Sequence, residues 1–99
     1  RLGYEQKVLE VFRETDDALV TYRNARRTAE AKGYLCDAAF KYVALARAQY
    51  RAGSIAYLDV LDAQRRYFDA QIGVSNARRD EYLALVALYK TLGGGWRQE

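Results

Sequence analysis

The sequence predicts an all-α fold, a single long antiparallel helical hairpin of the coiled-coil type. Three observations predict it. None of the 99 residues is proline, the residue that breaks helices. Alanine, the best helix former, is the commonest residue. Small and apolar residues recur at intervals of seven, the spacing of helices that supercoil around each other.

The first helix is predicted over residues 4–51. It ends before Gly53, which can adopt the left-handed conformation that closes many helices. Two heptad rows run along it and predict one face that packs against a partner helix. The rows are Val8, Thr15, Tyr22, Ala29, Cys36, Val43 and Tyr50, and Val11, Ala18, Ala25, Lys32, Ala39, Ala46 and Gly53.

The second helix is predicted over residues 55–92, with Ser54 as its N-cap. Asp59 lies near its first turn, where negative charge suits the helix dipole. A glycine run at 93–95 predicts a C-terminal stop over residues 93–99. The expected seam consists of an alanine row at 56, 63, 70, 77 and 84 and an adjacent row of larger residues, Leu61, Phe68, Ser75, Tyr82 and Tyr89. Gly33 and Gly73 are expected inside the helices, at a cost of about 1 kcal/mol each relative to alanine.

Further apolar rows lie outside these seams. One of them consists of Val60, Tyr67, Val74 and Leu88. A two-helix hairpin gives each helix only one neighbour, so we expect the hairpin to pack against additional helices. Isolated, it is expected to self-associate into a bundle. The additional helices can come from other copies or from chain outside residues 1–99, which we expect to form a single hairpin.

The residue types argue against enzyme activity. The chain has no histidine and one cysteine, and no glycine-rich phosphate loop follows a strand. No catalytic residues, metal site or cofactor are expected. Basic and acidic residues are interspersed, which is typical of a solvated helical surface rather than of a nucleic-acid-binding one.

Asp59 and Asp62 are three residues apart and share one helix face. They can form a local acidic site. They can equally be the ordinary acidic residues of a helix N-terminus. Spacing alone favours the second interpretation.

Three stretches carry a resemblance to a known family. Residues 50–65, YRAGSIAYLDVLDAQR, resemble the periplasmic tip of the outer-membrane efflux proteins, the TolC/OprM-like family. Residues 8–19 resemble the start of that family's long descending helix, and residues 85–96 its C-terminal signature. The order and spacing of the three also agree with the family.

The resemblance implies a role in transport. Members of this family are trimers that form a periplasmic α-barrel, the exit duct of tripartite efflux pumps and type I secretion systems in the Gram-negative outer membrane. It implies an adaptor protein and an inner-membrane pump as partners. Contact with the membrane is expected only through a β-barrel whose strands this sequence lacks. The chain is expected to be the second of two hairpins of a longer protein.

The resemblance also implies site residues in the tip, residues 50–57. Tyr50 matches a tyrosine that helps to close the periplasmic gate. Gly53 and Tyr57 belong to the same tip. Ile55 stands where relatives carry an arginine or an aspartate, which argues for an apolar constriction. Asp59 and Asp62 match two acidic positions at the duct entrance, where threefold symmetry would create carboxylate rings that favour cations.

Two other functions remain open. The chain can be an autonomous helical-hairpin interaction module without a transport role. It can also be a basic helical nucleic-acid binder, which predicts salt-dependent binding.

Overall fold

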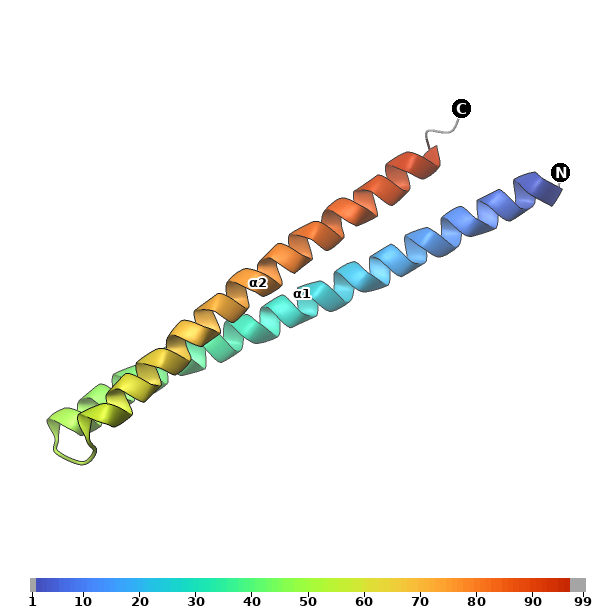
Figure 1. The fold of residues 1–99 in the computed structure, drawn as a ribbon. Coiled ribbons are helices and arrows are strands. Elements are labelled where there is room, and N and C mark those ends of the chain that lie inside the picture. The colour runs from blue at the N-terminus through green and yellow to red at the C-terminus, as the bar shows by residue number, and fades with distance from the viewer. Residues whose placement is uncertain (1, 97–99) are drawn as a thin grey trace.

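The computed structural model describes residues 2–96, and side chains within residues 6–93. It contains two helices, α1 (Leu2–Arg51) and α2 (Tyr57–Trp96). They fold back on each other into a rod of 78 × 16 × 14 Å. The helices lie together at the tip and their axes separate toward the two chain ends (Figure 1). The predicted all-α hairpin is confirmed.

The turn closes α1 in the way the sequence predicts. Gly53 has a φ of 83°, a left-handed conformation that glycine adopts without a steric penalty. The N–H of Gly53 donates to the carbonyl oxygen of Tyr50 over 2.9 Å, and the N–H of Ser54 donates to that of Gln49 over 2.9 Å. These two bonds form a Schellman motif, which satisfies carbonyl groups that the helix end leaves without partners.

The start of α2 differs from the prediction. The helix begins at Tyr57 rather than at residue 55, and Ser54 is not its cap. The Schellman motif uses the N–H of Ser54, so this residue belongs to the end of α1. Ala56 occupies the N-cap position instead. Its N–H donates to Oδ2 of Asp59 over 3.2 Å, and the N–H of Asp59 donates to its carbonyl oxygen over 3.0 Å.

The C-terminal end of α2 also differs. The helix continues through the glycine run at 93–95 to Trp96, beyond the predicted residue 92. Glycine weakens a helix by about 1 kcal/mol per residue but, unlike proline, it does not prevent the helical hydrogen bonds. Among the described glycines only Gly53 has a positive φ. The last part of the predicted stop, residues 97–99, lies outside the described residues.

In α1 the two predicted heptad rows face α2. Ala29, Val43 and Ala46 are buried, and the other members of the rows are half-buried except for Lys32, Tyr50 and Gly53, which are exposed. The prediction for this side of the interface is confirmed. We call the interface between the two helices the inner seam.

In α2 one of the two predicted rows is wrong. The alanine row does face α1, since Ala63, Ala77 and Ala84 are buried. The row that begins at Leu61 points away from α1, however, and its large side chains are 44–65% exposed. Two residues along a helix correspond to a rotation of about 200°, so Leu61 and Ala63 lie on opposite sides. The second row of the inner seam consists of Val60, Tyr67, Val74, Glu81 and Leu88, which are buried or half-buried.

The inner seam is best packed near the tip. Val43, Ala46, Val60 and Ala63 form one buried cluster, and Ile55 and Tyr67 pack against it. The rings of Phe40 and Tyr67 lie 5.5 Å apart, which extends this packing by one more layer. Beyond it, toward the chain ends, the buried side chains within residues 6–93 are alanines, at 29, 77 and 84. The apolar contact between the helices therefore becomes weaker with distance from the tip.

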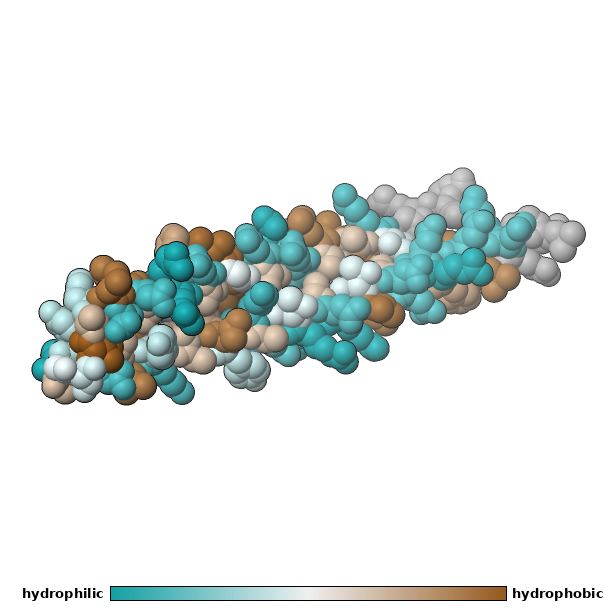
Figure 2. Space-filling model, turned by 60° about the horizontal axis from the view of Figure 1, so that its bottom comes forward, coloured by the Kyte–Doolittle hydropathy of each residue, from teal (hydrophilic) through white to brown (hydrophobic). Residues whose placement is uncertain are grey.

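A second apolar stripe lies on the opposite side of α2. We call it the outer stripe. It consists of Leu58, Leu61, Arg65, Phe68, Ile72, Ser75, Arg79, Tyr82, Val86 and Tyr89, which alternate in steps of three and four. Steps of three and four keep side chains on one helix face. Phe68 is 60% and Tyr82 65% exposed, and apolar side chains interrupt the polar surface at several places along the rod (Figure 2).

Ala63 tests the inner seam, because it is fully buried (0% exposed). Replacing Ala63 by leucine inserts three carbon atoms where α1 leaves no room. We expect the free energy of unfolding to fall by about 1–3 kcal/mol, the usual cost of overpacking. Urea unfolding followed by circular dichroism at a fixed protein concentration measures this loss. The matched control is Ala87→Leu on the exposed side of α2, for which we expect a change within about 0.5 kcal/mol. Equal losses would contradict the assignment of the inner seam.

Candidate functional site

The tip is bracketed by two tyrosines. Tyr50 ends α1 and Tyr57 begins α2, and their rings lie 5.1 Å apart at an angle of 60°. This tilted geometry is favourable for aromatic pairs. Both side chains remain about half exposed. The two predicted tip residues thus contact each other across the turn and still offer a surface to a partner.

Ile55 lies within the turn and is half-buried. It packs against the buried cluster near the tip. Because its side chain covers the end of the inner seam, a charged residue here would lose that apolar contact. The structure therefore explains why an apolar residue suits this position in the isolated hairpin.

The carboxylate of Asp59 is hydrogen-bonded to the backbone. It accepts the N–H of Ala56, a donor that the start of α2 would otherwise leave without a helical partner. The residue is exposed, so the rest of its carboxylate remains open to water.

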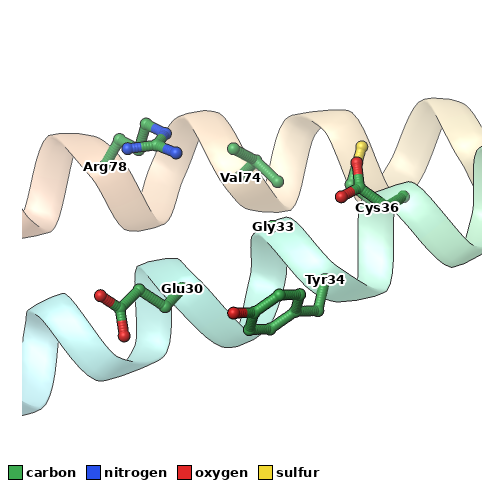
Figure 3. A pocket seen from close by; sticks show the side chains of 7 residues that line it. Glu30, Gly33, Tyr34, Cys36, Val74 and Arg78 are labelled. Carbon is green, nitrogen blue, oxygen red and sulfur yellow. The ribbon is translucent and has the colours of Figure 1, made fainter.

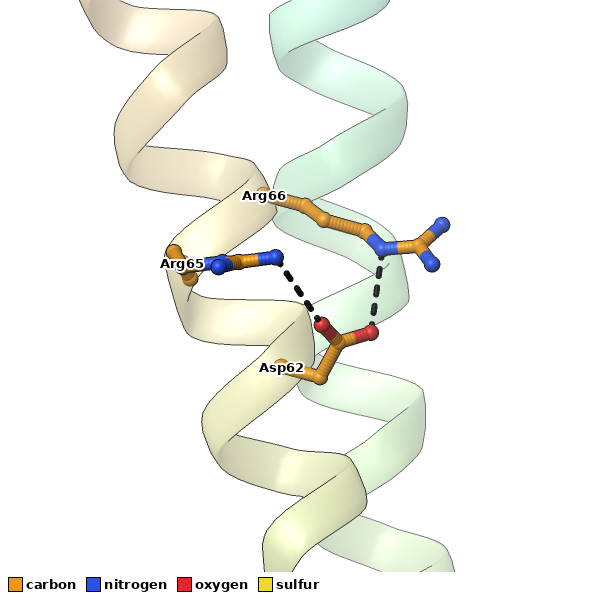
Figure 4. A network of polar contacts seen from close by, with 3 residues as sticks. All are labelled: Asp62, Arg65 and Arg66. Atoms are coloured by element: carbon orange, nitrogen blue, oxygen red, sulfur yellow. Dashed lines mark hydrogen bonds and ion pairs between the residues drawn. The ribbon is translucent and has the colours of Figure 1, made fainter.

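The carboxylate of Asp62 forms ion pairs with side chains of its own helix. Its Oδ1 lies 3.7 Å from Nη2 of Arg65, and its Oδ2 lies 3.0 Å from Nε of Arg66 (Figure 4). The arginine side chains are 75% and 67% exposed, so each pair contributes at most about 1 kcal/mol. The charge of Asp62 is nevertheless compensated by two guanidinium groups.

The two predicted acidic residues therefore do not form one site within the hairpin. Asp59 stabilises the helix start and Asp62 binds two arginines. Among the described residues no group of three or more metal-ligating side chains comes together. Arg65 and Arg66 are the residues that the sequence interpretation did not include in this site. Their positions three and four residues after Asp62 are the signal that predicts such pairs.

No helix in the described part of the chain is both long and apolar enough to cross a membrane.

Comparison with known proteins points to one family. The family model described as outer membrane efflux protein matches residues 1–94. The chain is 39% identical over 93 residues to the solvent efflux pump outer membrane protein SrpC of Pseudomonas putida. It is 37% identical over 94 residues to the outer membrane protein OprJ of Pseudomonas aeruginosa, and 33% identical over 97 residues to the cation efflux system protein CusC of Escherichia coli O157:H7. No solved structure gives a significant match.

These alignments cover 94%, 95% and 98% of the present chain but only 20%, 20% and 21% of the respective relatives. The chain thus spans about a fifth of the length of the curated relatives that it matches. The similarity includes the tip and both helices.

The cap at Asp59 and the ion pairs at Asp62 predict different losses of stability. Asp59→Ala removes the acceptor for the Ala56 N–H, and we expect the free energy of unfolding to fall by about 0.5–1 kcal/mol. Asp62→Ala removes only exposed ion pairs and is expected to cost less than about 0.5 kcal/mol. Thermal unfolding of the two variants beside the unchanged chain measures the difference. A larger loss for Asp62→Ala would contradict the assigned roles.

Proposed function

The chain belongs to the outer membrane efflux protein family, and on this basis we propose that it is one helical hairpin of the periplasmic part of an export duct in a Gram-negative outer membrane. The observation that carries the proposal is the family match along almost the whole chain. The rod shape supports it, because a long hairpin is a suitable element for the wall of a tube. The proposed role is passive conduction, without catalysis.

The outer stripe supports a position in such a wall. A helix in a closed tube of helices has one neighbour on each side, and α2 carries apolar heptad rows on two opposite sides. The inner seam binds α1, so the outer stripe is free to pack against a helix of a neighbouring hairpin. Closed symmetric assemblies remove such exposed apolar edges. The resemblance to a family of trimers implies that the parent protein is a trimer, and the exposed outer stripe supports this proposal.

The tip is the proposed site of gating and docking. Tyr50, Gly53, Ile55 and Tyr57 lie farthest from the chain ends, where a tube built from such hairpins would open. The half-exposed ring pair offers aromatic surface to a periplasmic adaptor protein or an inner-membrane pump. The proposed mechanism is a shift of population between two packings of the tips, each favoured by different partner contacts. With Ile55 at the tip, the closed constriction is apolar.

Asp59 and Asp62 are proposed to form acidic rings at the duct entrance, and the two residues differ in how much of their charge is compensated. Threefold symmetry would repeat Asp59 and Asp62 around the duct axis and attract cations. Arg65 and Arg66 compensate the charge of Asp62 within the same protomer, whereas no ion pair within the described part of the chain includes Asp59. Asp59 is therefore the stronger candidate for cation selectivity.

The principal alternative is an autonomous helical-hairpin interaction module. The length of the native gene product separates the two functions. A product several times longer than 99 residues supports the duct. A natural product that ends near residue 99 without a second hairpin contradicts it.

Ion selectivity of the full-length trimer tests the acidic rings. We expect Asp59→Asn to lower the preference for cations more than Asp62→Asn does, because the arginines already compensate Asp62. Reversal potentials in planar bilayers under a salt gradient measure the preference. Asp16→Asn, far from the tip, is the matched control and is expected to leave it unchanged. An unchanged reversal potential in the Asp59 and Asp62 double variant would refute the rings.

Association of the 99-residue chain tests the outer stripe. Phe68→Glu places a charge at its centre, and burying an unpaired charge in an apolar interface is costly. We expect the association constant to fall by tenfold or more, which corresponds to about 1.4 kcal/mol. Sedimentation equilibrium at several concentrations measures it. Asn76→Glu, on an exposed position beside the stripe, is expected to have little effect. A chain that stays monomeric without any substitution would remove the basis for this packing.

A further inference from the structure

Both helices carry a glycine at the same level of the rod, close to the middle of the hairpin. A Cβ atom added to Gly73 would lie 3.7 Å from Cδ of Lys32, and one added to Gly33 would meet no atom within 4 Å. Lys32 directly precedes Gly33, so the two glycines lie at the same level of the two helices. Neither has a positive φ, so no backbone conformation requires glycine at either position.

The packing is interrupted at this level. A surface groove of about 460 Å³ lies here, with Gly33 and Cys36 of α1 on one side and Val74 of α2 on the other (Figure 3). Lys32 occupies a position of the inner seam but is exposed, and only its flexible methylene chain reaches toward Gly73. Cys36 and Val74 at this level are half-buried, so they do not form a buried cluster like the one near the tip.

The two sides of this level differ in packing. On the tip side lie the buried cluster of Val43, Ala46, Val60 and Ala63 and the ring pair of Phe40 and Tyr67. On the other side the buried residues are alanines, and Glu81 occupies a position of the inner seam. The larger side chains of the inner seam in this part, such as Tyr22 and Leu88, are only half-buried. This part therefore buries less apolar area per residue than the tip side and is stabilised less.

We propose that the level of Gly33 and Gly73 is a hinge. It divides the hairpin into a stiff tip arm, residues 36–70, and a distal arm, residues 8–29 with 77–92, which bends and opens independently. Glycine gives each helix a locally softer backbone. Hinges of this kind are a few residues that absorb a change in backbone angles between two stiff parts. Because each helix can bend at its own glycine and both glycines lie at one level, the distal segments of α1 and α2 can move apart there while the tip arm stays together as one body.

Distances between spin labels test the hinge in the 99-residue chain, with Cys36 replaced by alanine and labelled chains diluted in unlabelled ones. The tip arm is labelled through Ala38→Cys and Asp69→Cys, and the distal arm through Asp17→Cys and Lys90→Cys; all four positions are exposed. We expect a narrow distance distribution in the tip arm and a broad one in the distal arm. In the Gly33→Ala and Gly73→Ala double variant, the distal distribution is expected to narrow to the width of the tip distribution.

Both alanines fit without a clash and favour the helix, so the double variant is expected to fold. Gly93→Ala is the matched control: it adds the same methyl group in open space near the end of α2 and is expected to leave the distal distribution broad. Equal widths in the two arms of the unchanged chain would overturn the hinge. So would a distal width that the double variant leaves unchanged, or that Gly93→Ala narrows to the same extent, which would indicate fraying of the helix end.

Discussion

The close packing of small residues along the inner seam is the constraint on which the rest of the hairpin depends. Ala63 is fully buried between the helices, and Val43, Ala46 and Val60 complete the cluster around it. Alanine lets the two backbones approach, and the seven-residue repeat keeps the contact on one face over the length of the helices. The Schellman motif at Gly53 and the cap at Asp59 reverse the chain within a few residues, which sets the register in which the two sides of the inner seam meet.

The inner seam does not account for most of the large apolar side chains. Phe68, Ile72 and Tyr82 are on the outer stripe, and Leu35 and Tyr34 of α1 are also exposed. A stable isolated hairpin would gain nothing from them. Under the proposed function, the inner seam forms the hairpin and these side chains of the outer stripe pack against a neighbouring hairpin in the wall of the duct. The same separation of roles is compatible with an inner seam whose buried residues are alanines and valines.

The acidic side chains at the tip make their contacts within their own chain. Asp59 accepts a backbone N–H at the helix start and Asp62 lies between Arg65 and Arg66. These contacts exist in a single chain and need no symmetry partner. A ring of carboxylates formed by three chains would therefore begin from partly engaged groups. This inequality between the two residues cannot be seen in the spacing of the acids alone.

The helical hairpin, the glycine at the turn and the face that α1 presents could all be predicted from the sequence. The absence of proline, the heptad spacing and the left-handed preference of glycine act within a few residues. The remaining features depend on contacts between the two helices. Val60 and Tyr67, rather than Leu61 and Phe68, lie beside the alanine row in the inner seam. The reason is that α2 carries two apolar stripes, and only contact with α1 determines which of them is buried. Ala56 and Asp59, rather than Ser54, cap the start of α2, because the N–H of Ser54 is hydrogen-bonded to the end of α1. The common level of Gly33 and Gly73 also depends on how the two helices align across the turn.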